Sequence, residues 1–122
     1  MGDAVIVQGL VLLGLYDAAI AKARGARLVV GLDTVASRRD LGAKFGVDHA
    51  FDASAMSEAE LAKQVRALCK PEGADVVFEV CGHPEVIPAG IRFLRNGGRY
   101  VLAGVVNPDS FASIDWKTSA GP

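Results

Sequence analysis

The sequence predicts an α/β fold in three layers, with a doubly wound parallel sheet between two layers of helices. Three observations support this prediction. Short apolar segments alternate with helical segments, the apolar segments are hydrophobic on both faces, and glycine, proline or aspartate separates the elements. Strands that are apolar on both faces belong to a parallel sheet that helices cover on both sides. Because crossover connections are right-handed, about five strands are expected in the order 3-2-1-4-5.

The first half of the chain supplies three strands and two helices. An apolar run, Ala4–Gln8, is the first strand and leads through a turn with two glycines into a helix over about Leu13–Arg24. The second strand is Arg27–Leu32, and an aspartate closes it. Val35–Phe45 has a helical pattern that a following glycine ends, and His49–Phe51 is a short third strand.

The second half supplies two more helices and two more strands. Met56–Cys69 has the clearest helical pattern, because a serine followed three residues later by a glutamate forms a capping box before a stripe of apolar residues. Asp75–Val80 is a continuous apolar strand and Glu85–Leu94 a helix. Asn96–Gly98 is expected to be a turn, and Arg99–Val105 the fifth strand.

Length and composition indicate one domain with its own core. The chain has 122 residues, of which 51% are hydrophobic and 22% charged, with a formal net charge of -1. At this length a hydrophobic core is possible without disulfides or metal. We expect the folded domain to span residues 1–106 and residues 107–122 to be an irregular C-terminal tail. The balanced, dispersed charges argue against binding to nucleic acid.

Cysteine content is informative about the cellular compartment, and hydropathy about whether the chain crosses a membrane. The two cysteines, Cys69 and Cys81, form no metal-binding or disulfide pattern, which is typical of a reduced, cytoplasmic protein. The apolar start of the chain lacks a basic leader and is interrupted by Asp3 and Asp17. It is therefore expected to be a buried strand and helix rather than a membrane span.

The turn between the first strand and the first helix is the main functional motif. Gly9 and Gly14 have the spacing of the first and third glycines of the Gly-x-Gly-x-x-Gly dinucleotide fingerprint, which makes the fold Rossmann-like. Val11 stands where the second glycine would be. A β-branched side chain there is expected to occupy space near a pyrophosphate and to resist a positive φ. Asp17, expected in the first helical turn, would repel a phosphate.

An acidic residue stands where the ribose of NAD is held in such folds. Asp33 follows Gly14 by nineteen residues and closes the second strand. The same aspartate could instead cap the following helix. Its position favours the ribose interaction, and its charge favours NAD over NADP. Arg38 and Arg39 could form a solvated helix face, or they could tolerate a 2′-phosphate.

Several segments together resemble a known family. Val5–Gly14, Asp33 at the strand end, Gly73–Val80 (GADVVFEV), Gly82–Pro84 and Leu94–Val101 (LRNGGRYV) are similar to the coenzyme-binding domain of the medium-chain, zinc-type alcohol dehydrogenases. In that family this domain binds NAD(H) or NADP(H), and a separate catalytic domain supplies the zinc ligands. The resemblance implies that this chain holds no zinc, lacks the sixth strand and is inactive on its own.

The resemblance and the motifs together define a set of candidate cofactor-binding residues. Arg38 matches a basic position that reaches the adenosine ribose in the family. Cys81 and Gly82 follow the fourth strand in a stretch that walls the family's cofactor cleft, although Cys81 could equally be a small buried residue. For Glu79 a structural hydrogen-bonding role is favoured over that of a general base. The full set is Gly9, Leu12, Leu13, Gly14, Asp33, Arg38, Cys81, Gly82 and Gly104.

The resulting hypothesis is a truncated nicotinamide-dinucleotide-binding domain of an alcohol dehydrogenase-like oxidoreductase. The alternative is a degenerate or engineered scaffold whose glycine turn has been filled by Leu10–Leu13 and which no longer binds a dinucleotide. Without a sixth strand, the apolar segment Tyr100–Val105 would be an exposed sheet edge. Such edges pair with other chains, so we also expect a homodimer through this edge or through the apolar glycine turn.

Overall fold

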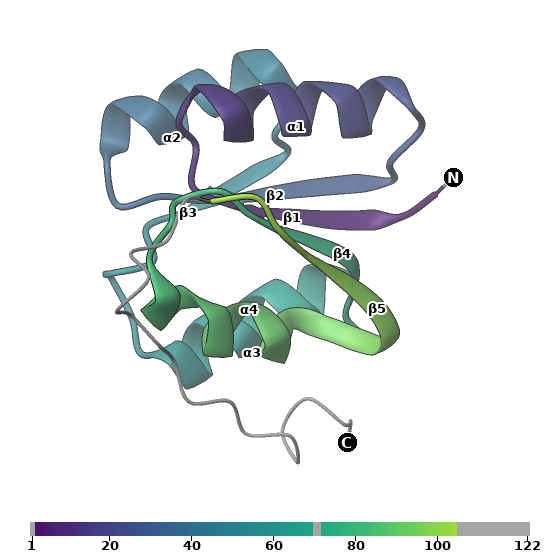
Figure 1. Ribbon diagram of the computed structural model, residues 1–122, viewed down its shortest axis with the longest axis vertical. Helices are drawn as coiled ribbons and strands as arrows, with labels where there is room; N and C mark the ends of the chain where they lie inside the picture. Colours follow the sequence, from purple (N-terminus) through teal and green to yellow (C-terminus); the bar gives the residue numbers. More distant parts are fainter. Residues whose placement is uncertain (1, 70–71, 105–122) are drawn as a thin grey trace.

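A five-stranded parallel sheet forms the middle layer of the computed structural model, which describes residues 2–69 and 72–104 (Figure 1). The strands lie in the order β3-β2-β1-β4-β5, as predicted. All four neighbouring pairs are parallel. The strand bounds are β1 Ala4–Gln8, β2 Leu28–Leu32, β3 His49–Phe51, β4 Ala74–Glu79 and β5 Leu94–Leu102.

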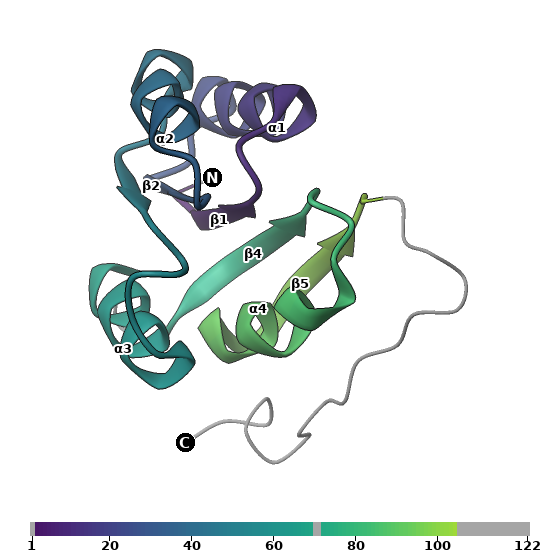
Figure 2. The same ribbon diagram turned by 90° about the vertical axis from the view of Figure 1, so that its left-hand side faces the viewer.

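Helices cover both faces of this sheet (Figures 1 and 2). α1 and α2 lie on one face, and α3 and α4 lie on the other. The helix bounds are α1 Leu12–Ala23, α2 Ala36–Gly42, α3 Glu58–Cys69 and α4 Ile87–Phe93, with short 3-10 turns η1 Ala43–Phe45 and η2 Pro84–Val86. Each face of the sheet therefore has its own apolar core, one against α1 and one against α3 and α4.

Most elements begin and end within two residues of their predicted positions, and the capping serine of α3 is confirmed. The Ser57 hydroxyl accepts the amide hydrogen of Glu60 at 3.1 Å. The predicted Asn96–Gly98 turn is wrong as a separate element, because these residues belong to β5. The pairing of β4 with β5 steps from Ala74↔Leu94 to Val76↔Arg99, so a bulge absorbs the extra residues of β5. Val105, predicted to end this strand, lies outside the described residues, as does the predicted tail at 107–122.

The strand order reverses at β1, and this position creates the site. β1 pairs with β2 on one side and with β4 on the other, and all five of its residues are buried. The connections from β1 and from β4 leave the sheet toward opposite faces, so a crevice opens at the carboxyl ends of these strands. Within the described residues, no helix is both long and apolar enough to cross a membrane.

Candidate functional site

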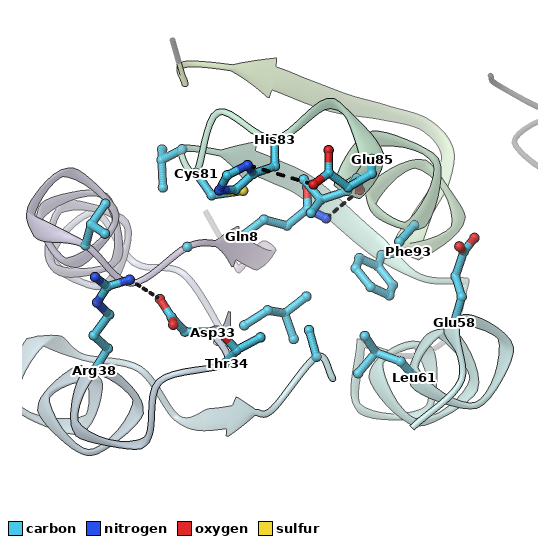
Figure 3. A pocket seen from close by; sticks show the side chains of 17 residues that line it. Gln8, Asp33, Thr34, Arg38, Glu58, Leu61, Cys81, His83, Glu85 and Phe93 are labelled. Atoms are coloured by element: carbon cyan, nitrogen blue, oxygen red, sulfur yellow. Dashed lines mark hydrogen bonds and ion pairs between the residues drawn. The ribbon is translucent and has the colours of Figure 1, made fainter. Parts of the chain in front are cut away.

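A pocket of about 450 Å³ opens at the carboxyl ends of β1, β2 and β4. Figure 3 shows Asp33 and Arg38 facing each other at one side of this pocket, while Gln8, Cys81 and His83 lie at another. Apolar side chains from α3 and α4, including Leu61 and Phe93, also line it. The pocket therefore combines a few polar groups at strand ends with an apolar wall, which is the usual composition of a small-molecule site.

The glycine turn is packed so closely that both glycines are required. Gly9 has a φ of +105°, and a Cβ atom on it would lie 3.0 Å from the Cβ atom of Cys81. A Cβ atom on Gly14 would collide with the carbonyl oxygen of Gly9. Leu10, between them, is fully buried and packs against Gly31 and the apolar core below α1. Leu10 thus anchors the turn in the core, and Gly9 lets it pack against Cys81 and Val80.

Val11 adopts a backbone conformation that any residue can adopt. It is the N-cap of α1, with φ −75° and ψ −179°, so the expectation that it would have to resist a positive φ is wrong. Gly9 provides the left-handed residue of this turn instead. The side chain of Val11 does line the pocket, in agreement with the expectation that it occupies space there. Val11 makes no side-chain capping bond, which leaves the first-turn amide groups of α1 without a side-chain partner.

Asp17 does not lie at the amino end of α1. The helix begins at Leu12 and its first turn contains no acidic residue, so the predicted repulsion of a phosphate by Asp17 in that turn is wrong. Asp17 is half-buried further along the helix, where burial raises the pKa of its carboxyl. The physical reason is that Asp17 is the sixth residue of a helix that begins at Leu12, and a start at Leu13 would also place it beyond the first turn of about 3.6 residues. The first turn of α1 therefore contributes no carboxylate that would offset the positive end of the helix dipole.

Asp33 combines a structural role with a place in the pocket wall. Its carboxylate accepts the amide hydrogens of Leu10 and Val35, both at 2.9 Å, so it joins the glycine turn to the start of α2. Arg38 lies 3.6 Å from the same carboxylate. Asp33 is only 8% exposed, yet it lines the pocket beside Thr34. A carboxylate has about four acceptor positions, so two amide bonds leave capacity for a ligand hydroxyl.

The end of β4 forms another wall of the pocket around Cys81. The Cys81 thiol lies 3.2 Å from the Glu79 carboxyl, which also accepts the Gly82 amide hydrogen at 2.7 Å. Burial, followed by the hydrogen bond to Glu79 and the charge of Glu79, raises the pKa of the Cys81 thiol to about 11, against a bond with the His83 backbone that lowers it. At neutral pH this cysteine is therefore a protonated, weakly nucleophilic wall residue.

A polar chain links the pocket to β5. The Tyr100 hydroxyl donates to the side-chain oxygen of Gln8 at 2.6 Å, and the Gln8 amide donates to the Val86 carbonyl at 2.9 Å. Burial, followed by the charge of Glu79, raises the pKa of the Tyr100 hydroxyl. Sequence reasoning missed Gln8 as a pocket residue. The available signal was a glutamine that ends an otherwise apolar buried strand.

The structure brings together only some of the predicted site residues. Gly9, Asp33, Arg38 and Cys81 line the pocket. The side chains of Leu12 and Leu13 point to solvent, with exposures of 62% and 46%. The predicted glycines outside the lining, which support it from behind, are Gly14, Gly82 and Gly104. Sequence reasoning also missed lining residues from α3, from η2 with its N-cap and from α4, namely Glu58, Leu61, His83, Glu85, Val86, Ala89 and Phe93.

The donor set of the pocket fits an organic ligand rather than a metal. Among the described residues, no group of three or more His, Cys, Asp or Glu side chains is placed to hold a metal ion. The pocket instead offers a turn that a Cβ atom would fill at Gly9, an uncapped helix terminus and a carboxylate at the end of β2. These features match the requirements of a phosphate linked to a ribose.

Comparison with known proteins defines the family. The chain matches the model of the zinc-binding dehydrogenases over residues 13–119, and it belongs to that family. It is 36% identical over 117 residues to an L-threonine 3-dehydrogenase of Vibrio cholerae, across 96% of this chain and 33% of that protein. The chain therefore spans about a third of the length of the curated relatives it matches.

Solved structures confirm both the fold and the resemblance to alcohol dehydrogenases. An alcohol dehydrogenase from Thermotoga maritima superimposes with a TM-score of 0.87 at 30% identity, covering 93% of this chain and 31% of that one. A protein from Sinorhizobium meliloti, described as a zinc-binding dehydrogenase and bound to NADP, gives a TM-score of 0.85 at 26% identity. That match covers 96% of this chain and 34% of the other.

Proposed function

We propose that this chain is a nicotinamide-dinucleotide-binding domain of an alcohol dehydrogenase-like oxidoreductase. The observation that carries the proposal is the convergence of three features on one pocket. These features are the left-handed Gly9, the uncapped amino end of α1 and the carboxylate of Asp33. In folds of this topology, a helix terminus binds the pyrophosphate and the acid at the end of the second strand binds the ribose hydroxyls.

We propose NAD rather than NADP as the preferred cofactor. The Asp33 carboxylate would repel the 2′-phosphate of NADP, and it is held in place by two backbone amides. Arg38 offsets part of this charge, whereas Arg39 pairs with Asp52 at 3.7 Å. The Arg38 side chain is 48% exposed and lies 3.6 Å from Asp33, so it is already engaged by that carboxylate. The NADP-bound neighbour makes a direct comparison of the two cofactors essential.

Titration of the purified chain with NADH tests the proposal and its alternative. We expect micromolar binding by the wild type, and tighter binding by Val11→Gly because the side chain that faces the pocket is removed. Val101→Gly is the control, since Val101 is an exposed valine on β5 that lies outside the pocket lining. If only the Val11→Gly variant binds, the degenerate-scaffold alternative is correct. NADPH binding tighter than NADH binding would contradict the proposed cofactor.

We further propose that the complete protein transfers a hydride between the nicotinamide and an alcohol or carbonyl carbon in the cytoplasm, and that this chain alone does not. The described residues line a pocket but include no group placed to hold a metal. We expect no change in absorbance at 340 nm when the chain is incubated with NAD and a panel of short alcohols or L-threonine. Turnover above a protein-free blank would refute the proposed inactivity.

A further inference from the structure

Glu79 is a fully buried acidic residue at the end of β4, just behind the pocket wall. One carboxyl oxygen, Oε1, accepts the Gly82 amide hydrogen at 2.7 Å and contacts the Cys81 thiol at 3.2 Å. The other oxygen, Oε2, is the one buried side-chain oxygen or nitrogen without a hydrogen-bond partner among the described residues. A half-satisfied buried carboxyl is costly, so its presence requires an explanation beyond packing.

The same residue also holds the segment that follows β5. The Glu79 carbonyl accepts the amide hydrogens of Ala103 at 2.8 Å and Gly104 at 3.0 Å. Gly104 packs so closely that a Cβ atom on it would lie 2.9 Å from Oε1 and would collide with the Gly82 amide. Glu79 therefore joins two segments, and three of the predicted site residues contact it: Cys81, Gly82 and Gly104.

The turn that Glu79 holds is in contact with the glycine turn. Gly82 has a φ of +74°, a conformation that the short bond to the carboxyl restrains. The Cβ atom of Cys81 lies against Gly9, where it limits the space beside the first glycine to that of a hydrogen atom. A shift of the Cys81–Gly82 turn would therefore change the shape of the pocket at Gly9.

We propose that Glu79 is a positioning residue that fixes the Cys81–Gly82 turn against Gly9 and thereby sets the shape of the pocket wall. Its effect on dinucleotide affinity rests on the proposed function, whereas its effect on the turn does not. A purely structural role in the core would be equally well met by an apolar side chain of the same size. The acceptor Oε1 is what an apolar side chain could not supply.

The first experiment uses no ligand. Alkylation of the two cysteines is followed by peptide mass spectrometry as a function of pH, in the wild type and in Glu79→Gln. The uncharged amide removes a charge that raises the pKa of Cys81. The Cys81 profile should therefore move to lower pH, with the rate at pH 8 rising about tenfold for each pH unit of the shift. Cys69 is the internal control: it is buried away from Glu79, and its profile should not move.

The second ligand-free measurement observes the turn itself. The Gly82 amide proton should be shifted downfield in the NMR spectrum of the wild type because it bonds to a carboxyl oxygen at 2.7 Å. Glu79→Gln keeps an acceptor and should retain slow hydrogen exchange at this amide, whereas Glu79→Leu should lose it. Unchanged Cys81 alkylation in Glu79→Gln, together with unchanged Gly82 exchange in Glu79→Leu, would overturn the proposal. If Glu79→Leu does not fold, the Gly82 amide of the wild type decides, and fast exchange without a downfield shift at this amide would overturn the proposal.

The third measurement connects the turn to the ligand. We expect NADH affinity to fall by about tenfold or more in Glu79→Leu and by less than about threefold in Glu79→Gln. Asp75→Asn is the matched control, because Asp75 lies at the opposite end of β4 and its carboxyl accepts the Ala4 amide hydrogen away from the pocket. It should leave NADH affinity unchanged.

Glu79→Leu that folds and binds NADH as tightly as wild type would overturn the link to the pocket. A wild type that does not bind NADH refutes the proposed function instead. In that case the ligand-free measurements still decide whether Glu79 positions the turn.

Discussion

At the residue scale, Val11 and Asp33 show that the role of a residue in a motif depends on the local backbone conformation. The middle glycine of a dinucleotide fingerprint is replaced by Val11, but the backbone there is extended and tolerates a side chain. The positive φ falls on Gly9 instead. Asp33 was expected either to bind a ribose or to cap a helix. In the structure the N-cap of α2 is Val35, so Asp33 does not cap this helix; its carboxylate accepts the Leu10 and Val35 amide hydrogens and stays at the pocket wall.

Asp33→Asn is expected to lower both stability and NADH affinity. An asparagine presents an NH₂ group to one of the two amide donors that Asp33 now accepts, so one buried bond is replaced by opposed donors. We expect a loss of about 1–3 kcal/mol in the free energy of unfolding. Asp40→Asn is the control on α2, because Asp40 is exposed and its change should cost less than about 0.5 kcal/mol. Urea unfolding and NADH titration measure both effects, and equal stability of the two variants would contradict this role of Asp33.

At the element scale, the β1–α1 turn depends on one leucine more than on its neighbours. Leu10 is fully buried in the core below α1, whereas Leu12 is 62% exposed at the start of the helix. Leu10→Ala should therefore lower the free energy of unfolding by about 2–5 kcal/mol, as for other buried leucines. Leu12→Ala should change it by less than about 0.5 kcal/mol. A comparison of their denaturant midpoints checks this prediction, and similar values would show that Leu10 does not anchor the turn.

The fifth strand shows where pattern alone misplaces an element. Asn96–Gly98 has the composition of a turn, and at the sequence level nothing distinguishes a turn from a bulge within a strand. In the structure, pairing with β4 continues on both sides of this segment, so the irregularity is part of β5. Pairing with β4, which is distant in the sequence, therefore determines that this segment belongs to a strand.

At the scale of the whole molecule, β5 and α1 both carry exposed apolar side chains. On β5, the edge strand of the described sheet, Val101 and Leu102 are 38% and 61% exposed. On α1, Leu12, Tyr16 and Ile20 are at least half exposed and recur every fourth residue along the helix. We propose that the chain forms a homodimer through the β5 edge, because unpaired backbone groups there can extend the sheet.

Light scattering at high protein concentration checks this proposal. We expect a dimer for the wild type and a monomer for Leu102→Lys, since a lysine on an edge strand opposes pairing. Ile20→Lys on α1 is the matched control and should remain dimeric. Dissociation by Ile20→Lys but not by Leu102→Lys would assign the interface to α1, and a monomeric wild type would contradict the proposal altogether.

The pocket residues at the ends of strands could be predicted from the sequence, whereas those on helices largely could not. Gly9 and Asp33 were found because fingerprint spacing places them at the ends of β1 and β2. Leu61 and Phe93 were not found, because a buried apolar residue on a helix has the same pattern whether it faces a core or a pocket. Glu79 was expected to have a hydrogen-bonding role, but its link to Gly104 depends on the pairing of β4 with β5.

By itself, the sequence determined the order of the elements and the parallel, doubly wound sheet, because these depend on local periodicity, on turn residues and on the handedness of crossovers. Its motifs also carried the resemblance to the family. Only the tertiary structure decided which backbone position carries the positive φ, where α1 begins and which side chains surround the pocket. Those features depend on contacts between segments far apart in the chain, such as Gly9 with Cys81 and Gln8 with Tyr100. Such contacts cannot be predicted from a local sequence pattern, because they form only when the strands pair in register and the helices pack on the sheet.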